Sequence, residues 1–507
     1  MNKFQIGWSE IDITPDKKAS LAGQFAERIS EYVEKPIVAT AMAVSDGEEQ
    51  MVLVSVDLVG VSFNLVAAVR EVLAKNEAGL DPMKVVFSAI HTHTAPGYPR
   101  HQKSQAVLAA SGGINNLRAT LEQFLQPGQK YVEKVNVSSN PDIVSATEYF
   151  DFLVERLAKV TLDAWAAREE ASFSNAFGRA VVGMCRRVGY NDGSAQMWGD
   201  ANTAVFEALE GGNDSGIELL YVFNKEKKLT GVVANLACPA QCVQHRLFVS
   251  PDFWGETKKL LREYFGEDLF LLAQCSAAGD QCPVDLVRWV DPYSPINDPN
   301  CERANPPKRK ADPSMFDLVG MKKAGKRIAN EIIEIWEEGL DEPQTEPEFE
   351  HRVKNMQLPI RRATLTDLNK AKQGIKDYLR DKNGADVDYN DVANLQVHLG
   401  VLNRFKAQEV LDVLDTEVHI IRMGTVAFAS NPFELFLDFG NQIKARSAAE
   451  QTFLIQLANG AEGYLPTAKA EEHGHYSAFI SSGQVGHIGG EQLVRETLQN
   501  IRQMFAE

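Results

Sequence analysis

Two histidines one residue apart, His91 and His93, are the side chains in this sequence best suited to chemistry. Residues 85–90 have the apolar character of a buried strand, and residues 94–97 have the composition of a turn. Alternate residues of an extended segment point to the same face, so both imidazoles can reach one centre. A neutral imidazole is a good zinc ligand, and a second one can move protons near neutral pH. The alternative is a pair of hydrogen-bonded histidines at a loop mouth, but the spacing favours metal binding or catalysis.

Two other strings of reactive side chains follow predicted strands. Cys238 and Pro239 follow one of them, and residues 278–283 (Ala-Gly-Asp-Gln-Cys-Pro) follow another and carry Asp280 and Cys282. Polar groups from strand ends that are distant in sequence and converge at one sheet edge are typical of an active site. We expect the proline after Cys282 to present its thiol rigidly toward the histidines.

The pattern of elements predicts a sheet with helices on its face. The apolar runs predict strands at 51–56, 85–90, 219–223, 229–234, 269–273, 418–423, 425–430 and 452–457, and helices at 64–75, 150–168, 253–265 and 321–337. The first two strands, with the helix between them, form a βαβ-like unit. Asp252 is predicted to cap the N-terminus of the helix at 253–265.

The organisation along the chain predicts a single catalytic domain over residues 1–507 with three insertions. Residues 101–140 are polar and glutamine-rich, as in a lid or substrate-recognition element; residues 285–314 form a loop excursion; residues 360–415 carry two charged helices. A chain of 507 residues exceeds the usual single-core size of roughly 250 to 300 residues, so such insertions are expected.

Composition excludes several classes of partner. The net charge of −17 argues against nucleic acid or an anionic membrane, because both require a basic surface. We expect neither a secretion signal nor a membrane anchor, and no uninterrupted apolar run reaches membrane-spanning length. The six cysteines are too few for a disulfide framework and indicate reduced thiols in a cytoplasmic protein. We expect a small-molecule substrate, and an oligomer is possible.

An ordered set of motifs resembles the neutral/alkaline, non-lysosomal ceramidase family. The motifs are residues 7–15 (Gly-Trp-Ser-Glu-Ile-Asp-Ile-Thr-Pro), the strand ending in Asp57, residues 90–97 (Ile-His-Thr-His-Thr-Ala-Pro-Gly), 278–283, 432–434 (Pro-Phe-Glu) and 463–467 (Gly-Tyr-Leu-Pro-Thr). Members of that family are zinc hydrolases that cleave the amide of N-acylsphingosines. Together the elements and the resemblance predict an α/β fold: a mixed-sheet, sandwich-like catalytic core covered by helices. The true ceramidases also carry a C-terminal immunoglobulin-like domain, which we expect to be absent here.

The resemblance implies a set of site residues. Matching positions would place zinc on His91, Glu434 and Tyr464, with His93 as the general acid or substrate-binding residue. The same matching implies a substrate-binding role for Arg186 and a second active-site tyrosine at Tyr476. Carboxylate and phenolate oxygens are hard ligands, so Glu434 and Tyr464 also make independent chemical sense.

Two positions depart from the family pattern. The second ligand histidine of the family is replaced by Cys238, whose thiolate could serve as a zinc ligand; otherwise His245 folds back to the metal, or the metal is lost. Cys282 stands where the family has a serine, and its thiol could be a nucleophile, a ligand or only a wall of the pocket.

These features favour a zinc-dependent hydrolase that cleaves an amide or related bond of a soluble substrate through a metal-activated water. One alternative is a glycan-active enzyme with a metal-activated thiolate among Cys238, Cys242, Cys275 and Cys282, with Glu434 and Asp280 as acid and base. It would use a tryptophan platform from Trp198, Trp254 or Trp289. A second alternative is a degenerate homologue that binds a ligand without catalysis.

Overall fold

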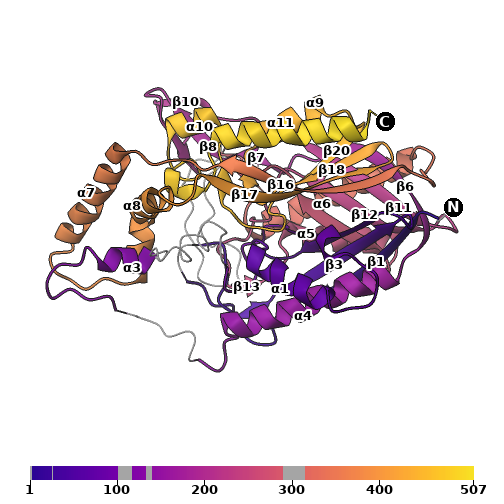
Figure 1. Cartoon of the computed structure of the whole chain (residues 1–507), viewed down its shortest axis with the longest axis horizontal. Helices are drawn as coiled ribbons and strands as arrows, with labels where there is room; N and C mark the ends of the chain where they lie inside the picture. The colour runs from indigo at the N-terminus through magenta and orange to yellow at the C-terminus, as the bar shows by residue number, and fades with distance from the viewer. Residues whose placement is uncertain (1–2, 25–26, 101–116, 133–139, 289–314, 507) are drawn as a thin grey trace.

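Two β-sheets packed face to face form the centre of the molecule (Figure 1). The computed structural model describes residues 3–24, 27–100, 117–132, 140–288 and 315–506. Within these residues the larger sheet has eight strands in the order β14 (Phe270–Cys275), β12 (Leu229–Leu236), β11 (Gly216–Asn224), β6 (Glu169–Arg179), β1 (Gln5–Asp12), β3 (Val38–Ser45), β4 (Gln50–Val56) and β5 (Val85–Ala89). The two pairs at its ends, β12 with β14 and β4 with β5, are parallel, and the pairs between them are antiparallel.

The smaller sheet covers the inner face of the larger one. Its described strands are β16 (Phe349–Pro359), β17 (Val413–Met423), β18 (Val426–Ser430) and β20 (Gln451–Ile455), and only β18 and β20 run parallel. Phe428 and Phe453 stack with ring centroids 4.7 Å apart and pack among apolar side chains of the larger sheet. The inner core is therefore shared by both sheets, as in a β-sandwich.

Helices cover both outer faces. On the larger sheet, α1 (Phe63–Leu73) and α4 (Ala146–Ala166) pack over one half, and α5 (Phe253–Phe265) and α6 (Asp317–Glu338) pack over the other. On the smaller sheet lie α9 (Leu437–Arg446) and α11 (His487–Met504), which Figure 1 shows at the top of the molecule. The four layers confirm the predicted α/β fold with a mixed-sheet, sandwich-like core covered by helices. No described helix is long and apolar enough to cross a bilayer.

Three helices form a separate group at one end of the molecule (Figure 1). They are α3 (Leu117–Glu122), α7 (Leu365–Asp381) and α8 (Tyr389–Ala407), which share one apolar cluster. Thr364 and Asp388 cap the N-termini of α7 and α8 with reciprocal side-chain bonds. The two helices predicted in 360–415 are thus present. Of the predicted insertion at 101–140, the described stretches are 117–132 and residue 140; of that at 285–314, only 285–288 are described.

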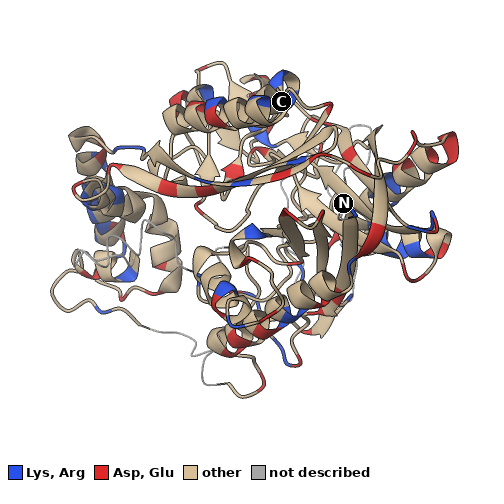
Figure 2. Cartoon of the chain, turned by 45° about the vertical axis from the view of Figure 1, so that its right-hand side comes forward, with Lys and Arg blue, Asp and Glu red and all other residues tan. Residues whose placement is uncertain are grey.

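Short strands near the ends of the main strands position the candidate site residues. They form the pairs β7 (Met184–Cys185) with β15 (Gln281–Cys282), β19 (Glu434–Leu435) with β21 (Tyr464–Leu465) and β2 (Tyr32–Val33) with β13 (Phe248–Val249), and the small sheet of β8 (Arg187–Tyr190), β9 (Ala195–Met197) and β10 (Phe206–Leu209). The helix α10 (Ala468–His473) follows β21. Charged residues of both signs are spread over the helices and loops around this core (Figure 2).

Candidate active site

His91 is held in a defined orientation directly after β5. Its backbone has φ 66°, and its buried ring donates from Nδ1–H to the carbonyl oxygen of Val59 at 2.6 Å. Val59 follows β4, the neighbour of β5, so the two adjacent strand ends fix the imidazole. Burial lowers the pKa of His91, although the nearby Glu434 carboxylate opposes the shift. The ring is therefore neutral, with the lone pair on Nε2.

Glu434 faces that lone pair. The Oε2 atom of Glu434 lies 3.5 Å from Nε2 of His91. Glu434 belongs to β19, where its Cα pairs with that of Tyr464 on β21, so the two side chains lie next to each other on one face. Gly279 lies directly against this strand, because a Cβ on it would be 2.3 Å from the carbonyl oxygen of Glu434. A glycine is thus required where the 278–283 motif passes β19.

Arg186 joins the tyrosines to the same motif. Its Nη2 donates to the carbonyl oxygen of Gly279 at 2.9 Å and lies 3.4 Å from the hydroxyl of Tyr464. The rings of Tyr464 and Tyr476 meet edge to face with centroids 5.4 Å apart. Burial, followed by the Glu434 charge, raises the pKa of Tyr464 well above 10, so both phenols keep their protons as the chain stands.

His93 packs edge-on against His91, with ring centroids 4.8 Å apart. Both of its ring nitrogens are buried and have no hydrogen-bond partner among the described residues. The ring is pressed against Gly23, where a Cβ would be 2.5 Å from Cγ of His93, and Arg28 donates to the His93 carbonyl at 2.6 Å. Burial lowers the pKa of His93 well below 6.5. An imidazole left without partners in this way is available to a ligand or water.

Two of the three predicted donors, His91 and Glu434, are placed to share a metal ion, and Tyr464 is the strand neighbour of Glu434. The Nε2 lone pair of His91 and a carboxylate oxygen of Glu434 are two acceptors that face each other. Ligand bonds of about 2.0–2.2 Å in a tetrahedron place neighbouring donor atoms roughly 3.4 Å apart, close to the observed separation of 3.5 Å. The Nδ1 bond to the Val59 carbonyl is the outer support that metal-bound histidines ordinarily have. Three protein ligands are also the number typical of catalytic zinc.

Cys238 does not join these donors. Among the described residues, no group of three histidine, cysteine, aspartate or glutamate side chains is arranged to hold a metal. The Cys238 thiol is buried and donates to the Pro239 carbonyl at 3.5 Å. Burial, followed by the nearby Cys275, raises its pKa well above 9. The His245 ring, 6.1 Å from that of Phe316, lies close enough to His93 to lower the pKa of that histidine slightly.

Cys282 lies in an apolar cluster with Val188 and Phe316. Its thiol donates to the Val284 carbonyl at 3.4 Å, and burial raises its pKa to about 12 although the Arg186 charge opposes the shift. A thiol in such surroundings is inert as a nucleophile near neutral pH. Cys242 and Cys275 are also buried, with pKa values raised by burial.

The two predicted aspartates support the backbone. Asp280 accepts from the N–H of Leu437 at 2.9 Å, at the N-terminus of α9, and burial raises its pKa to about 6. Asp252 accepts from the N–H groups of Phe253 at 2.6 Å and Val243 at 2.9 Å, and α5 begins at Phe253 as expected for an N-cap at Asp252.

Several supporting residues were missed by the sequence analysis. They are the Val59 carbonyl, Arg28 and Gln241, whose Oε1 lies 3.5 Å from Nη1 of Arg186. No local pattern points to them, because each acts on a residue far away in sequence. Of the predicted tryptophans, Trp254 is buried beside Phe253, Trp198 is half-buried in the cluster that includes Tyr476, and Trp289 lies outside the described residues.

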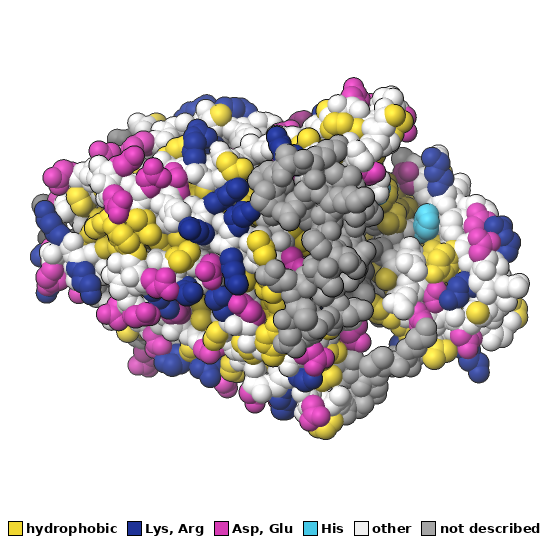
Figure 3. All heavy atoms as spheres, turned by 180° about the vertical axis from the view of Figure 1, so that it is seen from behind, with side chains coloured by type: hydrophobic (Ala, Val, Ile, Leu, Met, Phe, Trp, Pro, Cys, Tyr) yellow, Lys and Arg dark blue, Asp and Glu magenta, His cyan; other side chains and the backbone are white. Residues whose placement is uncertain are grey.

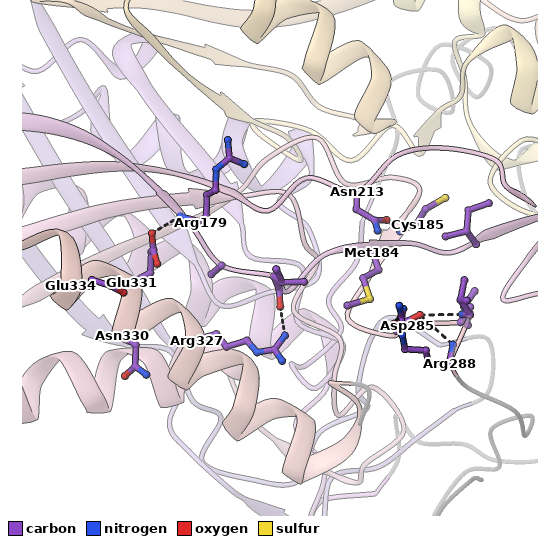
Figure 4. Close-up of a pocket in the computed structure, with 15 residues that line it drawn as sticks. Arg179, Met184, Cys185, Asn213, Asp285, Arg288, Arg327, Asn330, Glu331 and Glu334 are labelled. Carbon is purple, nitrogen blue, oxygen red and sulfur yellow. Dashed lines mark hydrogen bonds and ion pairs between the residues drawn. The ribbon is translucent and has the colours of Figure 1, made fainter. Parts of the chain in front are cut away.

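A separate cavity of about 700 Å³ lies beside β7 and α6 (Figure 4). It is lined by Arg179, Arg327, Glu331 and Asp285 among others, and by none of His91, Glu434 and Tyr464. Figure 3 shows lysine and arginine side chains mixed with acidic ones on one face of the molecule. The cavity carries the same mixture of charges and is distinct from the histidine site.

Comparison with solved structures identifies proteins that share the fold of this chain. No protein-family model and no curated protein matches the chain. Two solved structures that share the fold are ceramidases. The neutral ceramidase from Pseudomonas aeruginosa aligns with a TM-score of 0.63 and 15% identity over 99% of this chain and 75% of that chain. A structure described as a ceramidase complexed with C2 aligns with a TM-score of 0.63 and 14% identity over 100% of this chain and 75% of that one. The likeness confirms the fold that the resemblance implied.

Proposed function

We propose that this chain is a hydrolase that cleaves an amide or related carbonyl bond of a small soluble molecule, with a zinc ion held by His91, Glu434 and Tyr464. The observation that carries the proposal is the His91 ring, tied through Nδ1 to Val59 and presenting a bare Nε2 at 3.5 Å from the Glu434 carboxylate. The fold shared with ceramidases supports the hydrolytic class.

A bound zinc ion would polarise a carbonyl group and activate a water molecule at neutral pH. Around it, the guanidinium of Arg186 and the hydroxyl group of Tyr476 can donate hydrogen bonds to the substrate oxygen as negative charge develops on it. Neutral His93 carries one N–H and one lone pair, so it can hold a proton and deliver it to the leaving group.

A soluble rather than a membrane-bound substrate is supported by charge. The net charge of −17 disfavours approach to an anionic bilayer. We also propose a cytoplasmic location, because all five cysteines in the described residues are free thiols.

Metal analysis of three variants tests the proposal. Protein purified with zinc supplied should contain about one zinc per chain, and H91Q and E434Q should each lose it, because two remaining ligands bind weakly. C238S should keep the metal, because the Cys238 thiol donates to the carbonyl of the next residue, Pro239, rather than to the metal site. H398Q, which changes a half-buried histidine on α8, is the matched control.

Activity is measured on a panel of short-chain N-acyl amides before and after removal of the metal by a chelator. We expect hydrolysis that is lost on chelation and restored by zinc. Anomalous scattering at the zinc edge should place the ion beside His91 and Glu434. Wild-type protein that binds no zinc, or zinc that is retained in both H91Q and E434Q, contradicts the metal assignment.

A further inference from the structure

Two buried arginines follow each other in the sequence and point in different directions. Arg186 reaches the Tyr464 hydroxyl, whereas Arg187, the first residue of β8, reaches the backbone of the 474–477 segment. Successive side chains of an extended strand point to opposite sides, which places the two guanidinium groups on different sides of one backbone. Arg187 is fully buried, with an exposed fraction of 0%.

Every donor direction of the Arg187 guanidinium is used. Its Nε and Nη2 pair with the Glu210 carboxylate in a two-pronged ion pair. Nη1 donates to the Tyr476 carbonyl at 3.0 Å and to the Ser477 hydroxyl at 3.2 Å, and Nη2 donates to the Gly474 carbonyl at 2.7 Å. The carboxylate neutralises the buried charge, and the remaining donors hold one loop.

That loop has an unfavourable backbone. Gly474, His475 and Ser477 have φ values of 73°, 71° and 73°, a region that only glycine adopts readily. Left-handed residues other than glycine persist only when surrounding contacts determine them. The one residue between them, Tyr476, carries the phenol that packs against Tyr464. Arg187 bonds to the segment on both sides of this phenol, and the N–H of Met197 donates to Nδ1 of His475 at 3.1 Å. The contacts of Arg187 are therefore the larger part of the side-chain bonds that hold this segment.

Glu210 extends the clamp to the preceding helix. Its carboxylate also contacts Nδ1 of His473, the last residue of α10, at 3.0 Å, and its backbone carbonyl accepts from Lys469 at 2.9 Å. The N–H of Glu210 donates to the carbonyl of Arg187 at 2.9 Å. Arg187 and Glu210 thus connect β8, the segment after β10 and the chain from α10 to Ser477.

We propose that Arg187, neutralised by Glu210, is a positioning residue that holds the 474–477 segment in its bent form and so sets the place of the Tyr476 phenol beside Tyr464 and Arg186. The catalytic meaning of this role rests on the proposed hydrolase function. Arg187 itself does not face the substrate, so its loss should act on turnover through Tyr476 while leaving the His91 and Glu434 donors intact.

The test compares R187K with a matched control. Lysine keeps the charge but cannot donate to Glu210 and three oxygens of the loop at once. R70K is the control, because Arg70 likewise forms a two-pronged pair with a carboxylate, that of Glu417, and donates to the backbone carbonyls of Pro82 and Val85. E210Q removes the neutralising charge and leaves the loop acceptors in place.

Three readouts are measured. Proteins labelled with 3-fluorotyrosine give a ¹⁹F signal for Tyr476, assigned by its disappearance in Y476F; this signal should shift or broaden in R187K and stay unchanged in R70K. Amide exchange in the 474–477 segment should accelerate by about tenfold or more in R187K, because its backbone restraints are lost. With an amide that the wild type hydrolyses, kcat should fall by about 10- to 100-fold and KM should change by less than about threefold, as for a misplaced catalytic group. E210Q should give the same changes at smaller size.

The outcomes separate the two proposals. An unchanged Tyr476 signal and unchanged exchange in folded R187K overturn the positioning role, whatever the activity. A wild type that hydrolyses no amide defeats the proposed function, while the ¹⁹F and exchange data still decide the role of Arg187. If R187K does not fold, the double variant R187M/E210M, which leaves no unpaired charge, takes its place with the same readouts and the same criteria.

Discussion

Asp57 should make the stability of this protein fall as the pH rises toward neutrality. The residue directly follows β4, two positions before the Val59 carbonyl that orients His91, and its carboxylate accepts from the N–H of Val38 at 2.9 Å. It lines a cavity of about 290 Å³ beneath α5. Burial raises the pKa of Asp57 from 3.8 to about 7, although the Lys258 charge and the Val38 N–H act in the opposite direction.

The free energy of unfolding depends on pH because Asp57 has different pKa values in the folded and unfolded chains. Below pH 3.8 the side chain is protonated in both, and no stability is lost. Between pH 3.8 and about 7 the unfolded chain ionises while the folded chain keeps its proton, so the free energy of unfolding decreases. Above pH 7 both are ionised and the loss stays constant.

Replacement of Asp57 by asparagine removes this dependence while keeping an acceptor for Val38. Each pKa unit is worth about 1.4 kcal/mol. The free energy of unfolding of D57N relative to wild type should therefore increase by about 2 kcal/mol from pH 5 to pH 7, where the folded carboxyl is half ionised, and only slightly more by pH 8. Chemical denaturation at pH 5, 6, 7 and 8 measures it, with D16N at an exposed aspartate as control. Parallel stability curves for wild type and D57N would refute the reasoning.

Two further predictions concern buried groups beside the site. C282S should retain kcat/KM within about threefold, because a thiol whose pKa is about 12 acts only as a packed donor to the Val284 carbonyl; a loss of several orders of magnitude would instead identify a thiolate nucleophile. D252N should lower the free energy of unfolding by ~1 kcal/mol or less and leave activity unchanged, because asparagine can still cap α5; thermal unfolding and an activity assay check this, and an inactive folded variant would overturn the capping role.

The strands that sequence analysis predicted are those with continuous apolar runs. β4, β5, β12 and β14 are buried on both faces and rich in valine and leucine, so their composition alone distinguishes them. By contrast β3 contains three alanines, which suit a helix equally well, and β6 and β16 are largely polar. Their strand conformation is determined by partners across the sheet, which a local pattern does not reveal.

The candidate site likewise contains residues that the sequence predicted and residues that it did not. His91, Glu434 and Tyr464 were predicted because each follows a predicted strand and matches a ligand position of the family that the motifs resemble. Their supports act over long separations: Val59 and His91 are 32 residues apart, and Arg187 and Tyr476 are 289 apart. Cys238 is a residue that sequence matching suggested but whose side-chain orientation it did not predict. A matching position suggested a ligand, but the side chain turns to the Pro239 carbonyl, and orientation is decided by packing rather than by sequence position.

Arg186 and Arg187 differ in whether a carboxylate is hydrogen-bonded to the guanidinium group. Arg187 is matched by the Glu210 carboxylate, whereas the hydrogen-bond partners described for Arg186 are the neutral Gly279 carbonyl, Tyr464 hydroxyl and Gln241 amide. A buried cation without a directly bonded carboxylate is costly for folding. In addition, the Nε of Arg186 has no described partner. The Arg186 guanidinium is thus free to donate to a ligand beside Tyr464, which is what the proposed hydrolysis requires as negative charge develops on the substrate oxygen.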